Sequence, residues 1–181
     1  MSAITTDVDG NRGTPGRLIK VDHAGEFGAI NIYRAQILLA HIVAPSLVPP
    51  LKEFLAHERR HLEVFRAVLD RRGIRRCRSF MFCGVGGYLL GLATGVLGRR
   101  GIMACTAAVE SVVTAHLERQ MAFMQASGDE EAYSAVRSIL AEELEHQEAG
   151  VAQAQNSWLY KPIRFVVSRA TELVIWLGLK L

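Results

Sequence analysis

The chain has 181 residues, of which 50% are hydrophobic and 22% are charged, and its net charge at pH 7 is +3. This length predicts one domain, and the hydrophobic content excludes a chain that is mostly disordered. The weak charge argues against a nucleic-acid-binding protein, and three cysteines without a Cys-x-x-Cys spacing argue against a disulfide-built secreted domain. Residues 1–16 are polar and glycine-rich and lack the apolar run of a signal peptide, so we expect a disordered lead before a single domain over residues 17–181.

Apolar residues recur every three or four positions between sparse glycine and proline breaks, which predicts an all-α chain. Gly73 is expected to end the second helix, because glycine tolerates the left-handed backbone at a helix C-terminus. Ser127 and Glu130 have the spacing of a capping box for the fifth helix. The expected helices are Leu18–Ala40, Leu51–Arg72, Phe80–Leu97, Ile102–Gln125, Glu130–Ser157 and Pro162–Lys180. Four of them exceed twenty residues, the length scale of a four-helix bundle.

The third segment, about residues 80–98, differs from the long helices. It runs nineteen residues without a charge, includes six glycines and has arginines on both sides. Nineteen residues are just enough to span a bilayer, but basic residues at both ends favour a helix lying on an anionic membrane surface. Gly87, Gly91 and Gly95 form a ridge of small residues that lets another helix approach closely. We favour membrane contact, and a buried helix-packing ridge is the alternative.

The last expected helix, about residues 162–180, is amphipathic. Its apolar side consists of Ile163, Val166, Val167, Ala170, Leu173, Val174 and Leu177. A stripe of this kind predicts an ordinary packing face.

Each of the four long helices carries a glutamate within its apolar stripe, where a leucine is expected. Two of these glutamates begin a Glu-x-x-His pair, which places both side chains on one helix face. The six residues are Glu26, Glu58, His61, Glu110, Glu143 and His146. A carboxylate in an apolar stripe costs several kcal/mol unless a cation compensates it. No lysine or arginine falls on these stripes, which disfavours the alternative of interhelical salt bridges.

The six residues form two helical hairpins of one plan, a glutamate followed by Glu-x-x-His. Glu26 precedes Glu58 by 32 residues, and Glu110 precedes Glu143 by 33. Four glutamates and two histidines in a bundle core are the ligand set of ferritin-like di-iron and di-manganese proteins. Oxygen ligands with one imidazole per metal suit iron or manganese better than zinc or copper.

Several polar residues near this set have weaker signals. Asp22 lies one turn before Glu26 and is a candidate hydrogen-bond partner of a ligand histidine, with surface solvation as the alternative. Tyr33 and His116 are expected to be hydrogen-bonded core residues. Three further histidines, His23, His41 and His57, match no ligand pattern.

Four segments resemble the demethoxyubiquinone hydroxylase family of ubiquinone biosynthesis. They are residues 21–29 (Val-Asp-His-Ala-Gly-Glu-Phe-Gly-Ala), the Glu58-x-x-His61 pair, Ala104-Cys105-Thr106 before Val109-Glu110, and residues 142–146 (Glu-Glu-Leu-Glu-His). The resemblance runs from about Arg17 to the C-terminus. It implies a ferritin-like four-helix bundle with two additional hydrophobic or amphipathic helices. By this resemblance, one iron is bound by Glu26, Glu58 and His61 and the other by Glu110, Glu143 and His146. It leaves open which carboxylates bridge the irons, and no catalytic residue beyond the ligands is expected.

The resemblance also implies an activity, that of a 5-demethoxyubiquinone monooxygenase. Such an enzyme uses O₂ to hydroxylate the ring of demethoxyubiquinone (2-polyprenyl-3-methyl-6-methoxy-1,4-benzoquinone). Two electrons must come from an external donor. NADH is the candidate, directly or through a partner protein, since the chain contains no Gly-x-Gly-x-x-Gly fingerprint.

The expected partners are the polyprenylated quinone, a membrane surface, a lipid-binding protein of the pathway and its other enzymes, without nucleic acid. The sequence leaves open whether the chain forms a homo-oligomer. We expect a peripheral protein on the cytoplasmic face of a bacterial inner membrane, or on the matrix face of the mitochondrial inner membrane in a eukaryote. The ridge of Gly87, Gly91 and Gly95 would be the quinone's entrance. Another ferritin-like di-iron function, such as iron handling or peroxide reduction, and a non-enzymatic membrane-associated scaffold are the alternatives.

Overall fold

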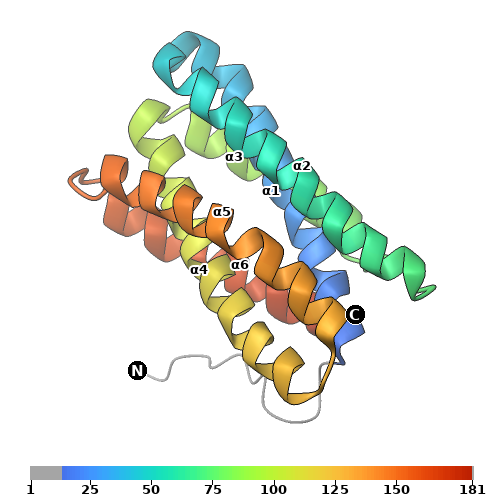
Figure 1. Ribbon diagram of the computed structural model, residues 1–181. Coiled ribbons are helices and arrows are strands. Elements are labelled where there is room, and N and C mark those ends of the chain that lie inside the picture. The colour runs from blue at the N-terminus through green and yellow to red at the C-terminus, as the bar shows by residue number, and fades with distance from the viewer. Residues whose placement is uncertain (1–13, 181) are drawn as a thin grey trace.

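The computed structural model describes residues 14–180, and over this range the chain is all-α, with no strand (Figure 1). The helices are α1 (Pro15–Val43), α2 (Val48–Arg71), α3 (Phe80–Gly95), α4 (Gly98–Ala126), α5 (Glu130–Ala154) and α6 (Tyr160–Lys180), with a short 3₁₀ helix, η1 (Pro45–Leu47), before α2. The predicted fold class is confirmed. The largest difference from the predicted boundaries is four residues, at the start of α4, which begins at Gly98 rather than Ile102.

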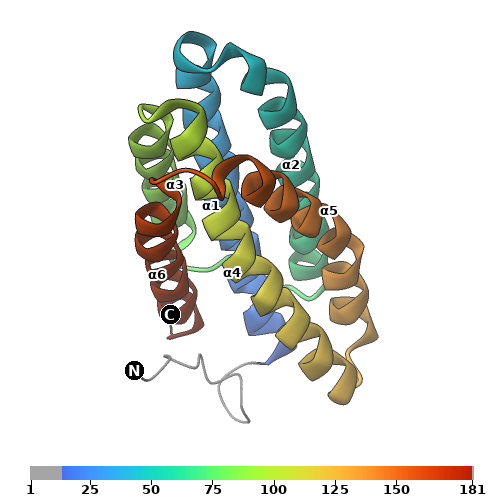
Figure 2. The ribbon, with the colours of Figure 1, turned by 90° about the vertical axis from the view of Figure 1, so that its left-hand side faces the viewer.

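The six helices are arranged as two hairpins with one covering helix each. The α1–α2 hairpin and the α4–α5 hairpin form the four-helix bundle (Figure 1). Helix α3 packs against α1, and α6 packs against α4, so that both covering helices lie on the same side of the molecule, away from α2 and α5 (Figure 2). The four helices that carry the glutamates are therefore the ones that enclose the bundle interior.

Local sequence explains where most helices begin and end. Gly73 has φ of +61°, as expected for the residue that ends α2. The predicted capping box at Ser127 is wrong, because Asp129 caps α5 by accepting a hydrogen bond from the Ala132 amide at 3.0 Å. Ser127 instead donates to the Met124 carbonyl. The expected lead, residues 1–16, falls largely on residues 1–13, outside the described range, and α1 already begins at Pro15.

The glycine ridge of α3 is a packing face against α1. A Cβ atom at Gly87 would overlap the Gly28 carbonyl oxygen, and one at Gly91 would overlap that of Ile32. The backbones thus approach as closely as the small-residue pattern predicts. Because α1 fills the ridge, the predicted quinone entrance between these glycines is wrong. Within residues 14–180, no helix has both the length and the hydropathy needed to cross a bilayer.

The outer faces of α3 and α6 carry large exposed apolar side chains. Helix α6 does not pack through the whole apolar stripe that was predicted, so this prediction is wrong. Val167 is buried, but Val166, Leu173 and Leu177 on the same stripe are exposed. Val167 packs against α4, and this rotates the remainder of the stripe outward. On α3, the exposed residues are Met81, Phe82, Val85, Tyr88 and Leu89.

Candidate metal centre

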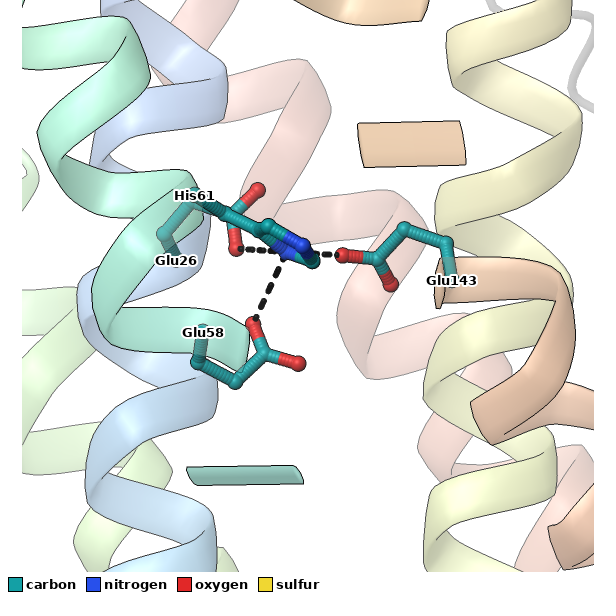
Figure 3. A group of neighbouring side chains, drawn as sticks. All are labelled: Glu26, Glu58, His61 and Glu143. Carbon is teal, nitrogen blue, oxygen red and sulfur yellow. Dashed lines mark ion pairs between the residues drawn. The ribbon is translucent and has the colours of Figure 1, made fainter. Parts of the chain in front are cut away.

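The structure brings all six predicted ligand residues together inside the four-helix bundle. They come from different helices: Glu26 from α1, Glu58 and His61 from α2, Glu110 from α4, and Glu143 and His146 from α5. All six are at most 5% exposed. Figure 3 shows Glu26, Glu58 and Glu143 directed toward the ring of His61. The polar residues that interrupt the apolar stripes therefore converge on one point.

Their ligand atoms form two overlapping groups. One group contains Glu26, Glu58, His61 and Glu143, and the other contains Glu58, Glu110, Glu143 and His146, with the atoms of each group within 4.8 Å of one another. Glu58 and Glu143 belong to both. Two metal positions that share two carboxylates are the geometry that this overlap favours.

The four glutamates of the cluster are buried close to one another. No lysine or arginine within residues 14–180 forms an ion pair with any of the four glutamates. Burial, followed by repulsion from the neighbouring carboxylates, raises the pKa values of Glu26, Glu58 and Glu110 well above the ordinary range. A cation between these side chains would remove the repulsion and favour their ionised forms.

The histidines face this cluster through their Nδ1 atoms. His61 Nδ1 lies 2.8 Å from Glu143 Oε1, and His146 Nδ1 lies 3.2 Å from Glu58 Oε1. Despite these short distances, none of the four atoms has an aligned hydrogen bond to any part of the chain that the structure describes. Buried polar atoms that converge without bonding one another leave their lone pairs available to a shared partner, so the donor set fits metal ions.

The opposite nitrogen of each ring contacts a residue of the other hairpin. His61 Nε2 lies 2.7 Å from the carboxylate of Glu142, which also pairs with Arg60. His146 Nε2 lies 3.1 Å from Nδ1 of His57, with the two rings stacked. A carboxylate that accepts from Nε2–H fixes the tautomer in which Nδ1 binds a metal.

Sequence reasoning missed both outer partners. Glu142 and His57 each directly precede a ligand glutamate, Glu143 and Glu58, and this adjacency is the signal that was available. It was not decisive, because each of them contacts the histidine of the opposite hairpin rather than its own. No spacing rule within one helix predicts such a contact.

The remaining candidates have mixed outcomes. Tyr33 is a buried, hydrogen-bonded core residue, as predicted, and its hydroxyl donates to Glu110 Oε1 at 2.9 Å. Asp22 is buried and accepts from Gln120 at 2.8 Å, but among the described residues it bonds no ligand histidine. Burial raises the pKa of Asp22 to about 7. His116 is buried, and neither of its ring nitrogens has a hydrogen bond within residues 14–180, contrary to the expected satisfied core histidine.

The fold and the cluster together define an all-α ferritin-like bundle with a carboxylate–histidine site between its four long helices. The model of the family "Ubiquinone biosynthesis protein COQ7" matches residues 14–178, and the chain belongs to this family. This confirms the resemblance seen in the sequence motifs.

Curated relatives agree with this assignment. A protein of Dictyostelium discoideum named NADPH-dependent 3-demethoxyubiquinone 3-hydroxylase, mitochondrial, is 32% identical over 165 residues, which cover 90% of this chain and 75% of the relative. A Bos taurus protein of the same name is 31% identical, with coverage of 94% and 80%. The 3-demethoxyubiquinol 3-hydroxylase of Rhodospirillum rubrum is 30% identical, with coverage of 90% and 76%.

Proposed function

We propose that this chain hydroxylates the ring of demethoxyubiquinone with O₂ at a centre of two iron ions. The observation that carries the proposal is the pair of overlapping ligand groups that share Glu58 and Glu143. The proposed substrate comes from the names of the relatives, which are demethoxyubiquinone or demethoxyubiquinol hydroxylases. Oxygen-rich ligand sets with one imidazole per metal support iron or manganese, and an O₂-dependent hydroxylation selects iron.

The geometry supports a more specific ligand assignment than the family motifs. Glu26 and His61 would serve one iron, and Glu110 and His146 the other. Glu58 and Glu143 would bridge both, because their oxygens lie in both groups. The proposed assignment has one bridging carboxylate from each hairpin.

The reaction consumes O₂, two electrons and two protons, places one oxygen atom on the ring carbon and releases the other as water. Iron held by the six ligand residues would supply the chemistry that reduces O₂ with the donor's electrons. The protein's residues do the rest: the buried walls exclude water, Glu142 and His57 orient the two ligand imidazoles, and Tyr33 holds Glu110. For the external donor, the relatives' names favour a reduced nicotinamide, NADPH in those proteins, over a donor of another class.

We further propose that the protein works at a membrane surface. The exposed apolar side chains on the outer faces of α3 and α6 support peripheral binding, which would give access to a polyprenylated quinone in the bilayer. A lipid-binding protein of the pathway, its other enzymes or a second copy of this chain would cover the same faces. The inner membrane, bacterial or mitochondrial, is the proposed location.

The test combines metal analysis with product analysis. The purified chain is loaded anaerobically with iron and given demethoxyubiquinone, a reductant and ¹⁸O₂, and we expect close to two irons per chain and one labelled oxygen in the product. Glu143→Ala should abolish the product, whereas Glu148→Ala, exposed on the same helix, should not. Iron uptake without product would instead indicate iron handling, and support of the pathway without bound iron would indicate a scaffold.

A further inference from the structure

A cavity of about 720 Å³ lies between α4 and α6, on the side of the bundle away from α2 and α5. None of the six ligand residues lines it. Its volume is within the range of small-molecule sites, which is about 300–1,000 Å³. The proposed chemistry at the metal centre does not use this space.

The cavity has an excess of positive charge. Five of its lining residues are charged, namely Arg119, Lys161, Arg164, Arg169 and Glu172. Arg169 pairs with Glu172 at 3.1 Å, which leaves the other three cations without an ion pair anywhere in residues 14–180. All three are exposed at the rim of the cavity, and the Arg164 guanidinium also lies over the Tyr160 ring at 5.9 Å. Three cations around one hollow would stabilise a bound anion, and each can donate charge-assisted hydrogen bonds.

A buried histidine with no partner also lines the cavity. His116 is 2% exposed, and both of its ring nitrogens lack a hydrogen bond among the described residues. Burial and the nearby Arg119 lower the pKa of His116 to about 4, so the ring is neutral at pH 7, with one donor and one acceptor. A buried pair of unmade hydrogen bonds is costly. Both nitrogens lie below the cavity surface, so a ligand bonds one of them only when the side chains that cover the ring move.

The remaining wall is apolar. Val112, Ala115 and Ile175 line the cavity, as does Phe165, which is 66% exposed. Phe165 continues outward to the exposed apolar face of α6 at Val166. A ligand that matches this surface has an anionic end and an apolar or aromatic body.

We propose that the α4–α6 cavity binds a phosphate ester, with the phosphate held by Arg119, Lys161 and Arg164 and the body held against Phe165 and His116. Two sources share this chemistry, an anionic phospholipid and a phosphorylated dinucleotide such as NADPH. A neutral quinone ring would leave the three cations without a counter-charge. The proposal is independent of the hydroxylase reaction, because binding is measured without turnover.

Isothermal titration of the iron-loaded full-length chain tests the site. The probes are dihexanoyl phosphatidylglycerol, its phosphatidylcholine analogue, NADPH and inorganic phosphate. We expect one site per chain for the anionic lipid or for NADPH, and which of the two binds identifies the source. The triple variant Arg119→Gln, Lys161→Gln, Arg164→Gln should weaken this binding by at least about tenfold, and high salt should weaken it in the wild type.

A matched triple variant controls for net charge. Arg75, Arg78 and Arg100 are exposed arginines outside the cavity, and changing all three to glutamine removes the same charge. This control should keep the wild-type affinity, and His116→Phe should weaken binding without any change in charge. Equal losses in the two triple variants, binding of inorganic phosphate alone, or equal binding of the zwitterionic and anionic lipids would overturn the proposal.

Discussion

The two hairpins carry the same ligand plan but place it in different surroundings. In α1–α2, His61 faces the carboxylate of Glu142, whereas in α4–α5, His146 faces the imidazole of His57. A carboxylate partner that accepts from the ring N–H makes an imidazole a stronger metal ligand than a second imidazole does. The repeat in the sequence therefore does not make the two metal positions equivalent, and the position at His61 should bind the more tightly.

The two covering helices, α3 and α6, also differ from each other in how they pack on the bundle. Helix α3 packs on α1 through glycines, with no space between the backbones, whereas α6 leaves the cavity beside α4. Helix α3 thus contacts α1 backbone to backbone, whereas the side chains of α6 and α4 surround a cavity. Substitutions should thus be tolerated very differently in the two halves.

The largest expected effect separates shared from unshared ligands. Glu143→Ala should remove nearly all bound iron, because its oxygens lie in both ligand groups. Glu26→Ala, by contrast, should leave about one iron per chain, since Glu26 belongs to only one group. Metal analysis of both variants after anaerobic loading checks this, and equal stoichiometries would contradict the shared assignment.

The next effect tests the tight covering helix. Gly91→Leu should lower the free energy of unfolding by about 3 kcal/mol or more, because the new side chain meets the α1 backbone at Ile32. Ala115→Leu, which places similar bulk into the α4–α6 cavity, should change stability by less than about 1 kcal/mol. Urea unfolding of the two variants measures the difference. If both are equally stable, α3 does not pack as described.

A stabilising change tests the burial of charge in both halves. Replacing Glu58 and Glu110 together with leucine should stabilise the metal-free protein by about 1–4 kcal/mol, because two buried polar carboxyls give way to apolar side chains. Function should be lost. The matched pair Glu53→Leu, Glu118→Leu lies on exposed positions of the same helices and should give no such gain. A lower melting temperature for the first double variant would argue that its carboxyls are not buried.

The pH dependence follows from the raised carboxyl pKa values. Glu26, Glu58 and Glu110 keep their protons in the folded metal-free state at pH values where the unfolded chain has lost them. Their contribution is complete below the ordinary glutamate pKa near 4.5 and is lost as the pH rises through the raised values. Asp22 adds to the loss between its ordinary 3.8 and about 7.

The metal-free protein should therefore melt at a lower temperature at pH 8 than at pH 5.5. Its free energy of unfolding should fall by up to about 1.4 kcal/mol per pH unit for each such carboxyl. The metal-loaded protein should show the opposite trend, because a metal binds the ionised carboxylates in competition with protons. Melting curves of both forms across this range distinguish them. Parallel trends would show that the carboxyls and the metal do not share a site.

The smallest effect compares the two outer partners. Glu142→Gln should weaken metal binding at the His61 position by about tenfold. Changing the residue that bonds the other ring nitrogen of a ligand histidine lowers metal affinity by about this much. His57→Gln should have a smaller effect, because neither side chain supplies a carboxylate to His146. Stepwise cobalt titration followed by visible absorption resolves the two positions. The reverse order of effects would contradict the proposed inequivalence.

Helix positions and the six ligand candidates were predictable because they depend on local periodicity. A glutamate within an apolar stripe, such as Glu58, is visible from the sequence of one helix. Contacts between helices were not predictable in this way. The pairing of Glu142 with His61, the donation from Tyr33 to Glu110 and the packing angle of α6 depend on how separate helices are rotated against each other.

The ridge of Gly87, Gly91 and Gly95 shows the same limit. Its small-residue spacing correctly predicts a close helix contact. The spacing does not say whether a protein helix or a ligand fills the space, and α1 fills it. His116 is the opposite case, since nothing in its sequence neighbourhood shows that its nitrogens are left without partners.

The central claim is that two metal ions share Glu58 and Glu143. The most direct measurement is a crystal structure of the anaerobically iron-loaded protein with diffraction data collected at the iron absorption edge. The account predicts two anomalous peaks about 3.5–4 Å apart, as in other two-metal sites, with both peaks bordered by oxygens of Glu58 and Glu143. A single peak, or two peaks that do not share these carboxylates, would contradict it.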